Sequence, residues 1–199
     1  MNSLTARILT GAVAISAVAS TVHAQRISAR SMTADVPLAP SETKFLRGMS
    51  DADVLGHLIV LDSVEVDVSK AAIRRSKSDA VTAFAKQTLA DHGSAMNADK
   101  QIGKQTGIAP TMIVGELKKS HMGAQVDSVD IASDLTVDRH YIMSQVEMHQ
   151  HAIAELQTLR EVARNPAIRA HIDAQIPAMR EHLAKAHEIA MSKGFEKKM

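Results

Sequence analysis

Apolar residues recur along this chain at alternating steps of three and four, the spacing that places side chains on one face of an α-helix. Four segments of the 199 residues carry such a stripe: 54–72, 81–103, 142–163 and 168–189. Alternation with a period of two, which would indicate strands, is nearly absent. The pattern therefore predicts an all-α protein with four long helices.

Start and stop signals mark the ends of these helices. Ser50, with Asp53 three residues on, and Ser78 are predicted N-caps of the first two helices. Asn165-Pro166 is an N-cap followed by proline at the first helical position, a start signal for the fourth. Gly107 and Gly194 are predicted to end the second and fourth helices.

The lengths of the connections predict the topology. The first two helices are joined by about four residues, and the last two by a similarly short turn near Asn165, so each pair should form an antiparallel hairpin. The third helix begins around Asp134 or Thr136, which leaves a long connection over 108–133. We predict an antiparallel four-helix bundle of the ferritin-like type, with two helical hairpins joined by a long crossover.

The N-terminal residues have the composition of a secretory signal peptide. Arg7 precedes an apolar run over 8–20, and a small-x-small motif ends at Ala24, where cleavage is predicted. The run is shorter than the roughly 20 residues of a membrane-spanning helix. We therefore expect a periplasmic or secreted protein with no stable membrane insertion after cleavage.

The domain organisation follows from these segments. We assign residues 1–24 to the signal peptide and 25–43, rich in Ser, Arg and Pro without periodicity, to a flexible linker. Residues 44–194 form the bundle, and 195–199 are a short tail.

Composition narrows the chemistry. The net charge is +1, and loss of Arg7 with the signal peptide would leave a neutral chain. With one tyrosine, three phenylalanines and no tryptophan, the chain lacks the basic face and stacking groups of nucleic-acid binders. It contains no cysteine, so a metal would have to bind through nitrogen and oxygen, with methionine as the only sulfur ligand.

Each stripe is interrupted by one side chain able to bind a metal. These candidate metal ligands are Glu65, His92, His149 and His182. Imidazole and carboxylate ligands suit a transition metal, Zn, Cu or Fe, better than Ca²⁺ or Mg²⁺. The alternative is a buried Glu–His hydrogen-bond network that only fixes the register of the helices.

Helical rise tests whether these residues share one level of the bundle. His149 lies about 16 residues before the last turn and His182 about 17 after it, so the two should sit at nearly the same height at roughly 1.5 Å per residue. Glu65 and His92 are offset by about five residues, or roughly 7 Å, and Asp62 is closer to the level of His92. Asp91, Glu147 and Glu181 each lie within two residues of a candidate histidine and should flank the site, where a solvated position is favoured over a ligand role for all three.

The remaining histidines of the helices fall off the main stripes. We expect surface positions for His140, His151, His171 and His187. The pattern also allows a surface position for His57, which lies on the flank of the first helix.

Three short motifs resemble those of a bacterial family catalogued as domain of unknown function 4142. They are Phe84-Ala85-Lys86-Gln87 before Asp91-His92, Asp138-Arg139-x-Tyr141 before His149, and His182-Leu183. The resemblance covers about residues 44–193 and places Glu65 at the family's acidic position in the first helix. It implies an exported ferritin-like bundle and no established activity. The Glu-x-x-His motif of di-iron bundles is absent from the chain, which argues against ferroxidase chemistry and favours a mononuclear site or none.

Two functional hypotheses follow. The first is an exported bundle that binds a transition metal through the buried His/Glu cluster. The second is a non-enzymatic envelope or stress-related protein that acts on an envelope partner or as a homo-oligomer and whose network is only structural. Nucleophile elbows, phosphate loops and dinucleotide fingerprints are absent, so nothing in the sequence indicates an enzyme.

Overall fold

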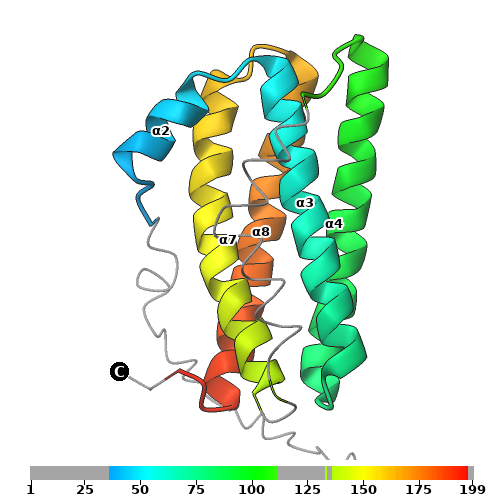
Figure 1. The fold of residues 1–199 in the computed structure, drawn as a ribbon, viewed down its shortest axis with the longest axis vertical. Coiled ribbons are helices and arrows are strands. Elements are labelled where there is room, and N and C mark those ends of the chain that lie inside the picture. Colours follow the sequence, from blue (N-terminus) through cyan, green and yellow to red (C-terminus); the bar gives the residue numbers. More distant parts are fainter. Residues whose placement is uncertain (1–35, 112–132, 134–135, 197–199) are drawn as a thin grey trace, which may run out of the picture.

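A computed structural model describes residues 36–111, 133 and 136–196. Within these residues the chain forms five α-helices and no strand: α2 (Pro40–Arg47), α3 (Asp51–Arg75), α4 (Asp79–Thr106), α7 (Val137–Val162) and α8 (Pro166–Ser192). The four long helices form a bundle, and α2 packs against the outside of α7 (Figure 1). The predicted all-α four-helix bundle is confirmed. The predicted signal peptide, residues 1–24, lies outside the described residues.

The predicted caps form at three of the four helix starts. Ser50 and Asp53 form a reciprocal capping box at the start of α3. The Ser78 hydroxyl accepts a hydrogen bond from the Val81 amide, and Asn165 accepts one from the Ala167 amide at the start of α8. Each bond satisfies an amide that the first helical turn leaves unpaired.

The helix directions give the crossover topology. α3 packs against α4 and α7 against α8 as antiparallel hairpins, and α4 also packs against α8 while α3 packs against α7 (Figure 1). α4 ends at the end of the bundle opposite to the start of α7 (Figure 1). Residues 107–136 therefore connect opposite ends of the bundle (Figure 1).

The chain that follows α4 crosses close to the start of α3. Gly107 takes the left-handed conformation (φ 71°) that ends α4. The Thr111 amide then donates to the Ala52 carbonyl, and a side-chain carbon at position 56 would overlap the Thr111 backbone. Gly56 thus allows the chain to cross α3.

Two predictions made from the pattern need correction. The linker predicted to run to residue 43 stops earlier, because α2 begins at Pro40; this helix has eight residues and one buried side chain, Leu46, too little for a periodic signal. Steps of three and four along the predicted stripe over 81–103 place Leu89 and Met96 on the inward face of α4, but both are only partly buried, while Thr88 is buried. Thr88 thus takes the inward position predicted for Leu89, one residue away.

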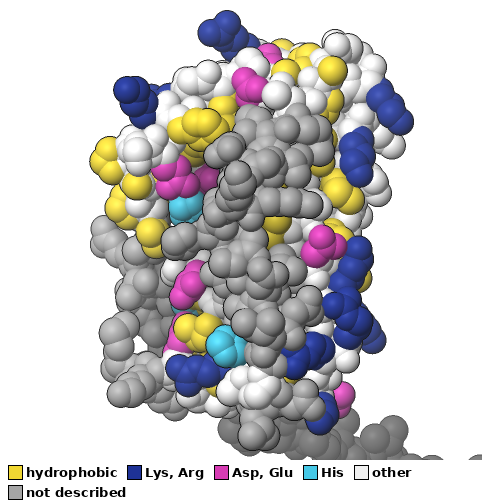
Figure 2. Space-filling model, in the orientation of Figure 1, with side chains coloured by type: hydrophobic (Ala, Val, Ile, Leu, Met, Phe, Trp, Pro, Cys, Tyr) yellow, Lys and Arg dark blue, Asp and Glu magenta, His cyan; other side chains and the backbone are white. Residues whose placement is uncertain are grey.

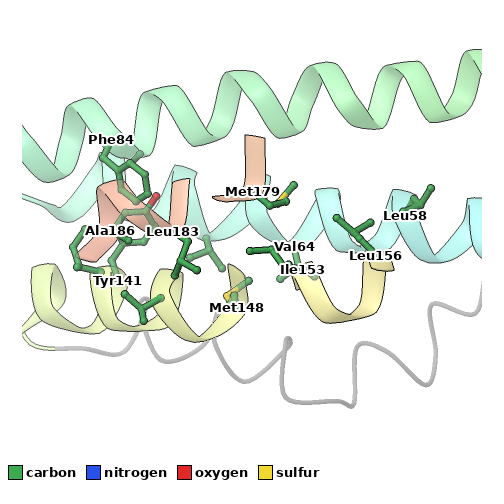
Figure 3. Packing of buried hydrophobic residues seen from close by; sticks show 14 of the residues in the cluster. Leu58, Val64, Phe84, Tyr141, Met148, Ile153, Leu156, Met179, Leu183 and Ala186 are labelled. Atoms are coloured by element: carbon green, nitrogen blue, oxygen red, sulfur yellow. The ribbon is translucent and has the colours of Figure 1, made fainter. Parts of the chain in front are cut away.

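The core is apolar along most of its length. Aromatic and aliphatic side chains from all four long helices pack along the bundle axis (Figure 3). The Phe84 and Tyr141 rings lie 6.1 Å apart between α4 and α7. Among the described residues no helix is long and apolar enough to span a membrane. Buried polar side chains, among them His92, His149 and His182, interrupt this core.

Candidate metal centre

Three buried histidines meet at the centre of the bundle. His92, His149 and His182 come from α4, α7 and α8, and each is at most 2% exposed. Their ring centroids lie 5.2–5.6 Å apart, and one nitrogen of each ring lies within 4.8 Å of one nitrogen of each of the others. His149 Nε2 and His182 Nδ1 are 3.2 Å apart. We call these three residues the histidine triad.

An acceptor stands behind each ring of the triad. His92 Nδ1 lies 2.8 Å from Asp62 Oδ1, and His182 Nε2 lies 2.9 Å from Asp91 Oδ2. His149 Nδ1 lies 2.9 Å from the Gln145 carbonyl oxygen. Such partners fix the orientation and tautomer of histidines that bind a metal through the other nitrogen.

The hydrogen bonds of the triad require a proton that a cation could replace. His149 Nδ1 donates to a carbonyl, so in the neutral ring Nε2 is an acceptor. His182 would then donate from Nδ1 to His149 and from Nε2 to Asp91, which places a proton on both of its nitrogens. His92 Nε2 is buried and has no hydrogen-bond partner among the described residues.

Glu65 lies on the outer side of His149. Its Oε2 accepts a 2.7 Å hydrogen bond from Gln145 Nε2, and its Oε1 lies 3.6 Å from His149 Nδ1. The carboxylate is thus next to the nitrogen of His149 that faces away from His182. The structure brings the three predicted histidines together and places the predicted acid beside them.

Burial determines the electrostatics of the site. It lowers the pKa of His92, and it lowers the pKa of His149 well below its usual 6.5, where the other two histidines add to the effect. Both imidazoles are therefore neutral, the form that binds metals. Burial also raises the pKa of Glu65, and for Asp62 burial and then the neighbouring Asp99 raise it well above the usual value. Among the described residues no Lys or Arg is buried to balance these carboxyl groups.

A polar chain leads from the triad towards the surface. Gln175 Nε2 lies 3.4 Å from Asp62 Oδ2 and 3.1 Å from His171 Nε2. His171 Nε2 is in turn 3.0 Å from Asp99 Oδ1, and its side chain is partly exposed. Burial lowers the pKa of His171, but the hydrogen bond and charge of Asp99 outweigh it and the net shift is upward.

The surface positions expected for the other histidines are only partly right. His140 is exposed, but His57 and His187 are buried, and His151 and His171 are partly buried. The physical reason for His57 is that α3 is covered on nearly every face from 54 to 62, so its flank does not reach solvent. His187 is covered in part by the chain that follows α8, because its Nδ1 lies 3.1 Å from Glu196 Oε1.

Sequence reasoning missed some members of the site and anticipated others. Asp62 was placed at the level of His92, and the two are hydrogen-bonded. Asp91 flanks the site and is half exposed, as expected, but it also contacts His182, a role beyond the solvated position that was favoured for it. Asp99 was missed, although it lies seven residues after His92 and therefore on the same face of α4.

Comparison with known proteins places this bundle in a family. The family model for a domain of unknown function, DUF4142, matches residues 34–189. The chain belongs to the DUF4142 family. A crystal structure of a DUF305 fragment from Deinococcus radiodurans is similar in fold to this DUF4142 protein, with a TM-score of 0.59 and 15% identity over 77% of this chain and 97% of that one. At this identity the likeness concerns the fold alone. The comparison with curated proteins gives no match.

Proposed function

We propose that this DUF4142 protein is an exported metal-binding protein that holds one transition-metal ion between His92, His149 and His182. The observation that carries the proposal is the orientation of the triad. Each ring has one nitrogen held by an acceptor from behind and the other available among its neighbours, and one of these, His92 Nε2, is buried without a hydrogen-bond partner among the described residues. A purely structural network would be expected to satisfy that nitrogen.

The spacing of one pair of nitrogens suits a tetrahedral ion. With Zn–N bonds of about 2.0–2.1 Å, two ligand nitrogens of a tetrahedral site are about 3.3 Å apart. His149 Nε2 and His182 Nδ1 are separated by 3.2 Å. An ion bound here would take the place of the proton that these two nitrogens share.

The surrounding charges favour a cation. Asp62 and Glu65 are buried beside the triad, and Asp99 is buried near Asp62, with no buried Lys or Arg among the described residues. A positive charge nearby would lower the raised pKa values of Asp62 and Glu65. In this proposal Glu65 does not complete the set of facing nitrogens; it positions Gln145 and His149 from behind.

The ligand type narrows the metal and leaves a free coordination position. Three imidazoles suit Zn²⁺, Cu²⁺ or Fe²⁺. They disfavour Ca²⁺ and Mg²⁺, because these ions prefer oxygen ligands. A mononuclear site with three protein ligands leaves a fourth position open to water or a small ligand. The proposed export, based on the signal peptide over 1–24, would place this site in the cell envelope or outside the cell.

Metal stoichiometry tests the proposal. Untagged protein lacking the signal peptide is loaded with Zn²⁺ or Cu²⁺, passed through a desalting column and analysed for bound metal, together with His92→Gln, His149→Gln and His182→Gln. Each triad variant should bind one equivalent less than the wild type. His140→Gln, an exposed histidine on the same helix as His149, is the matched control and should bind as much as the wild type.

Helical content measured by circular dichroism verifies that each variant is folded. The proposal is overturned if folded triad variants bind as much metal as the wild type. It is also overturned if the wild type retains no metal and its melting temperature does not respond to metal. Either result would favour the structural network and a function at the protein surface.

A further inference from the structure

A second cluster of histidine and carboxylate side chains lies at the outer face of the bundle, where α2 meets α7. Glu42 of α2, His151 and Glu155 of α7 each offer one ligand atom, and these atoms all lie within 4.8 Å of one another. His151 Nε2 is 2.6 Å from Glu42 Oε1 and 3.7 Å from Glu155 Oε1. We call these three residues the α2 cluster. They share no residue with the histidine triad.

A buried histidine supports the inner side of this cluster. His57 of α3 is 1% exposed, and its Nε2 lies 3.3 Å from Glu155 Oε2. Neither nitrogen of His57, nor Glu155 Oε2, has a hydrogen bond of good geometry among the described residues. Burying an imidazole against a carboxylate without satisfying either is costly unless another charge completes the arrangement.

The outer side of the cluster is open. The side chains of His151 and Glu42 are 42% and 28% exposed. In the view of Figure 2 a histidine is visible beside acidic side chains where α2 meets the bundle. An ion could thus reach the three ligand atoms from solvent without any opening of the core.

We propose that the α2 cluster is a second metal site, which binds a divalent cation through Glu42, His151 and Glu155, with His57 supporting the second oxygen of Glu155. Two carboxylates and one imidazole form an oxygen-rich set, which accepts Mn²⁺ or Zn²⁺, whereas the all-nitrogen triad disfavours Mn²⁺. The two sites therefore differ in the metals they select.

The consequence of binding is a link between α2 and the bundle. α2 contributes one buried side chain, Leu46, and an exposed ion pair between Arg47 and Glu161. A cation bound by Glu42 on α2 and by His151 and Glu155 on α7 would cross-link the two helices. Metal binding would then decide whether α2 is held against the bundle.

Mn²⁺ binding measured by electron paramagnetic resonance tests this site separately from the triad. Free Mn²⁺ gives a strong signal that is lost on binding, so the wild-type protein should bind one Mn²⁺ per chain. Glu42→Gln and His151→Gln should weaken that binding at least tenfold. Because both side chains are partly exposed, these variants are expected to remain folded.

Two controls identify the site. Glu161→Gln removes an exposed carboxylate that also joins α7 to α2, and it should leave Mn²⁺ affinity unchanged. His182→Gln, which disables the triad, should also leave it unchanged, so failure of the triad proposal would not affect this result. The inference is overturned if Mn²⁺ does not bind at millimolar concentration, if Glu42→Gln and His151→Gln bind like the wild type, or if Glu161→Gln weakens binding as much as they do.

Hydrogen exchange provides a readout that a surface ion pair alone would not change. Saturating Mn²⁺ should slow amide exchange in residues 43–48 of the wild type and of Glu161→Gln. It should leave exchange unchanged in Glu42→Gln. Equal protection by Mn²⁺ in Glu42→Gln would contradict the link between α2 and α7.

Discussion

The histidine triad and the α2 cluster are built from the same residue types and differ in their surroundings. The triad lies among four helices at no more than 2% exposure, whereas two of the three residues of the α2 cluster are partly open to solvent. Burial lowers the pKa of His149 well below 6.5 and raises that of Glu65. Burial in the core thus favours the neutral forms of His149 and Glu65, whereas charges near the surface are screened by water.

This difference shows what each arrangement can contribute. In the core every polar contact has a large effect, because an unsatisfied group there cannot be compensated by solvent. At the surface a contact adds little to stability but a ligand can enter and leave. We therefore expect substitutions in the triad to have the larger effect on folding stability, and the α2 cluster to exchange a bound ion with the solution more readily.

Substitution of one glutamate in each region should give the largest difference in the free energy of unfolding. Glu65→Ala leaves Gln145 Nε2 without its acceptor and creates a cavity in the core, so we expect a loss of about 3 kcal/mol in the free energy of unfolding. Glu42→Ala removes a partly exposed ion pair with His151 and should cost less than about 1 kcal/mol. Urea denaturation without added metal measures both.

The metal-free state is essential to that comparison, because a bound ion would add its own stabilisation. Equal losses for the two variants would mean that Glu65 is not coupled to the core network as the structure indicates.

The pH dependence of stability is the next largest effect. In the unfolded chain His149 takes up a proton below about pH 6.5, whereas burial prevents this in the fold. The unfolded state then binds more protons, so the free energy of unfolding falls as the pH decreases, by up to about 1.4 kcal/mol per unit for this residue. Asp62 and Glu65, whose pKa values are raised, act in the opposite direction.

A comparison of variants separates these contributions. The difference in stability between the wild type and His149→Gln should shrink as the pH is lowered from 7 to 5, measured by urea denaturation at each pH. His140→Gln, at the surface of the same helix, should keep the slope of the wild type. A constant difference between wild type and His149→Gln would contradict a buried neutral imidazole.

The fold was predictable from the sequence because its determinants are local. The stripes and the caps at Ser50, Ser78 and Asn165 specify each helix from neighbouring residues alone. The matched heights of His149 and His182 follow from helical rise, and their rings are in contact. The height of a residue along a helix axis follows from counting residues, so the pairing of His149 with His182 was predictable from the sequence.

The rest of the site depends on which helices pack against one another, which the sequence pattern does not specify. Asp99 shares the face of α4 that carries His92, but its burial and its contact with His171 depend on how α8 packs against α4. His57 and Glu155 are paired because α3 and α7 pack together, and Glu42 joins them only through α2, a helix too short to leave a pattern. Such contacts between helices are decided by packing.

Metal release should also separate the two regions. Once both sites are loaded with Zn²⁺, excess chelator should remove the ion from the α2 cluster on the order of tenfold faster or more, the factor that a local opening of about 1.4 kcal/mol gives for the triad. A chromogenic chelator should record two phases. Glu42→Gln should abolish the fast phase and His182→Gln the slow one, and the reverse assignment would contradict the contrast in accessibility.

The smallest expected effect concerns the ion pair that joins α2 to α7 outside both clusters. Arg47 and Glu161 are each about 60% exposed, so Arg47→Ala should change the free energy of unfolding by less than about 1 kcal/mol, and the change should vanish in 1 M salt. Urea denaturation at low and high salt measures this. Because this pair contributes so little, the position of α2 should depend on the α2 cluster, and Mn²⁺ should protect its amides in Arg47→Ala as it does in the wild type. Loss of that protection would show that the ion pair, rather than the cation, holds α2 against the bundle.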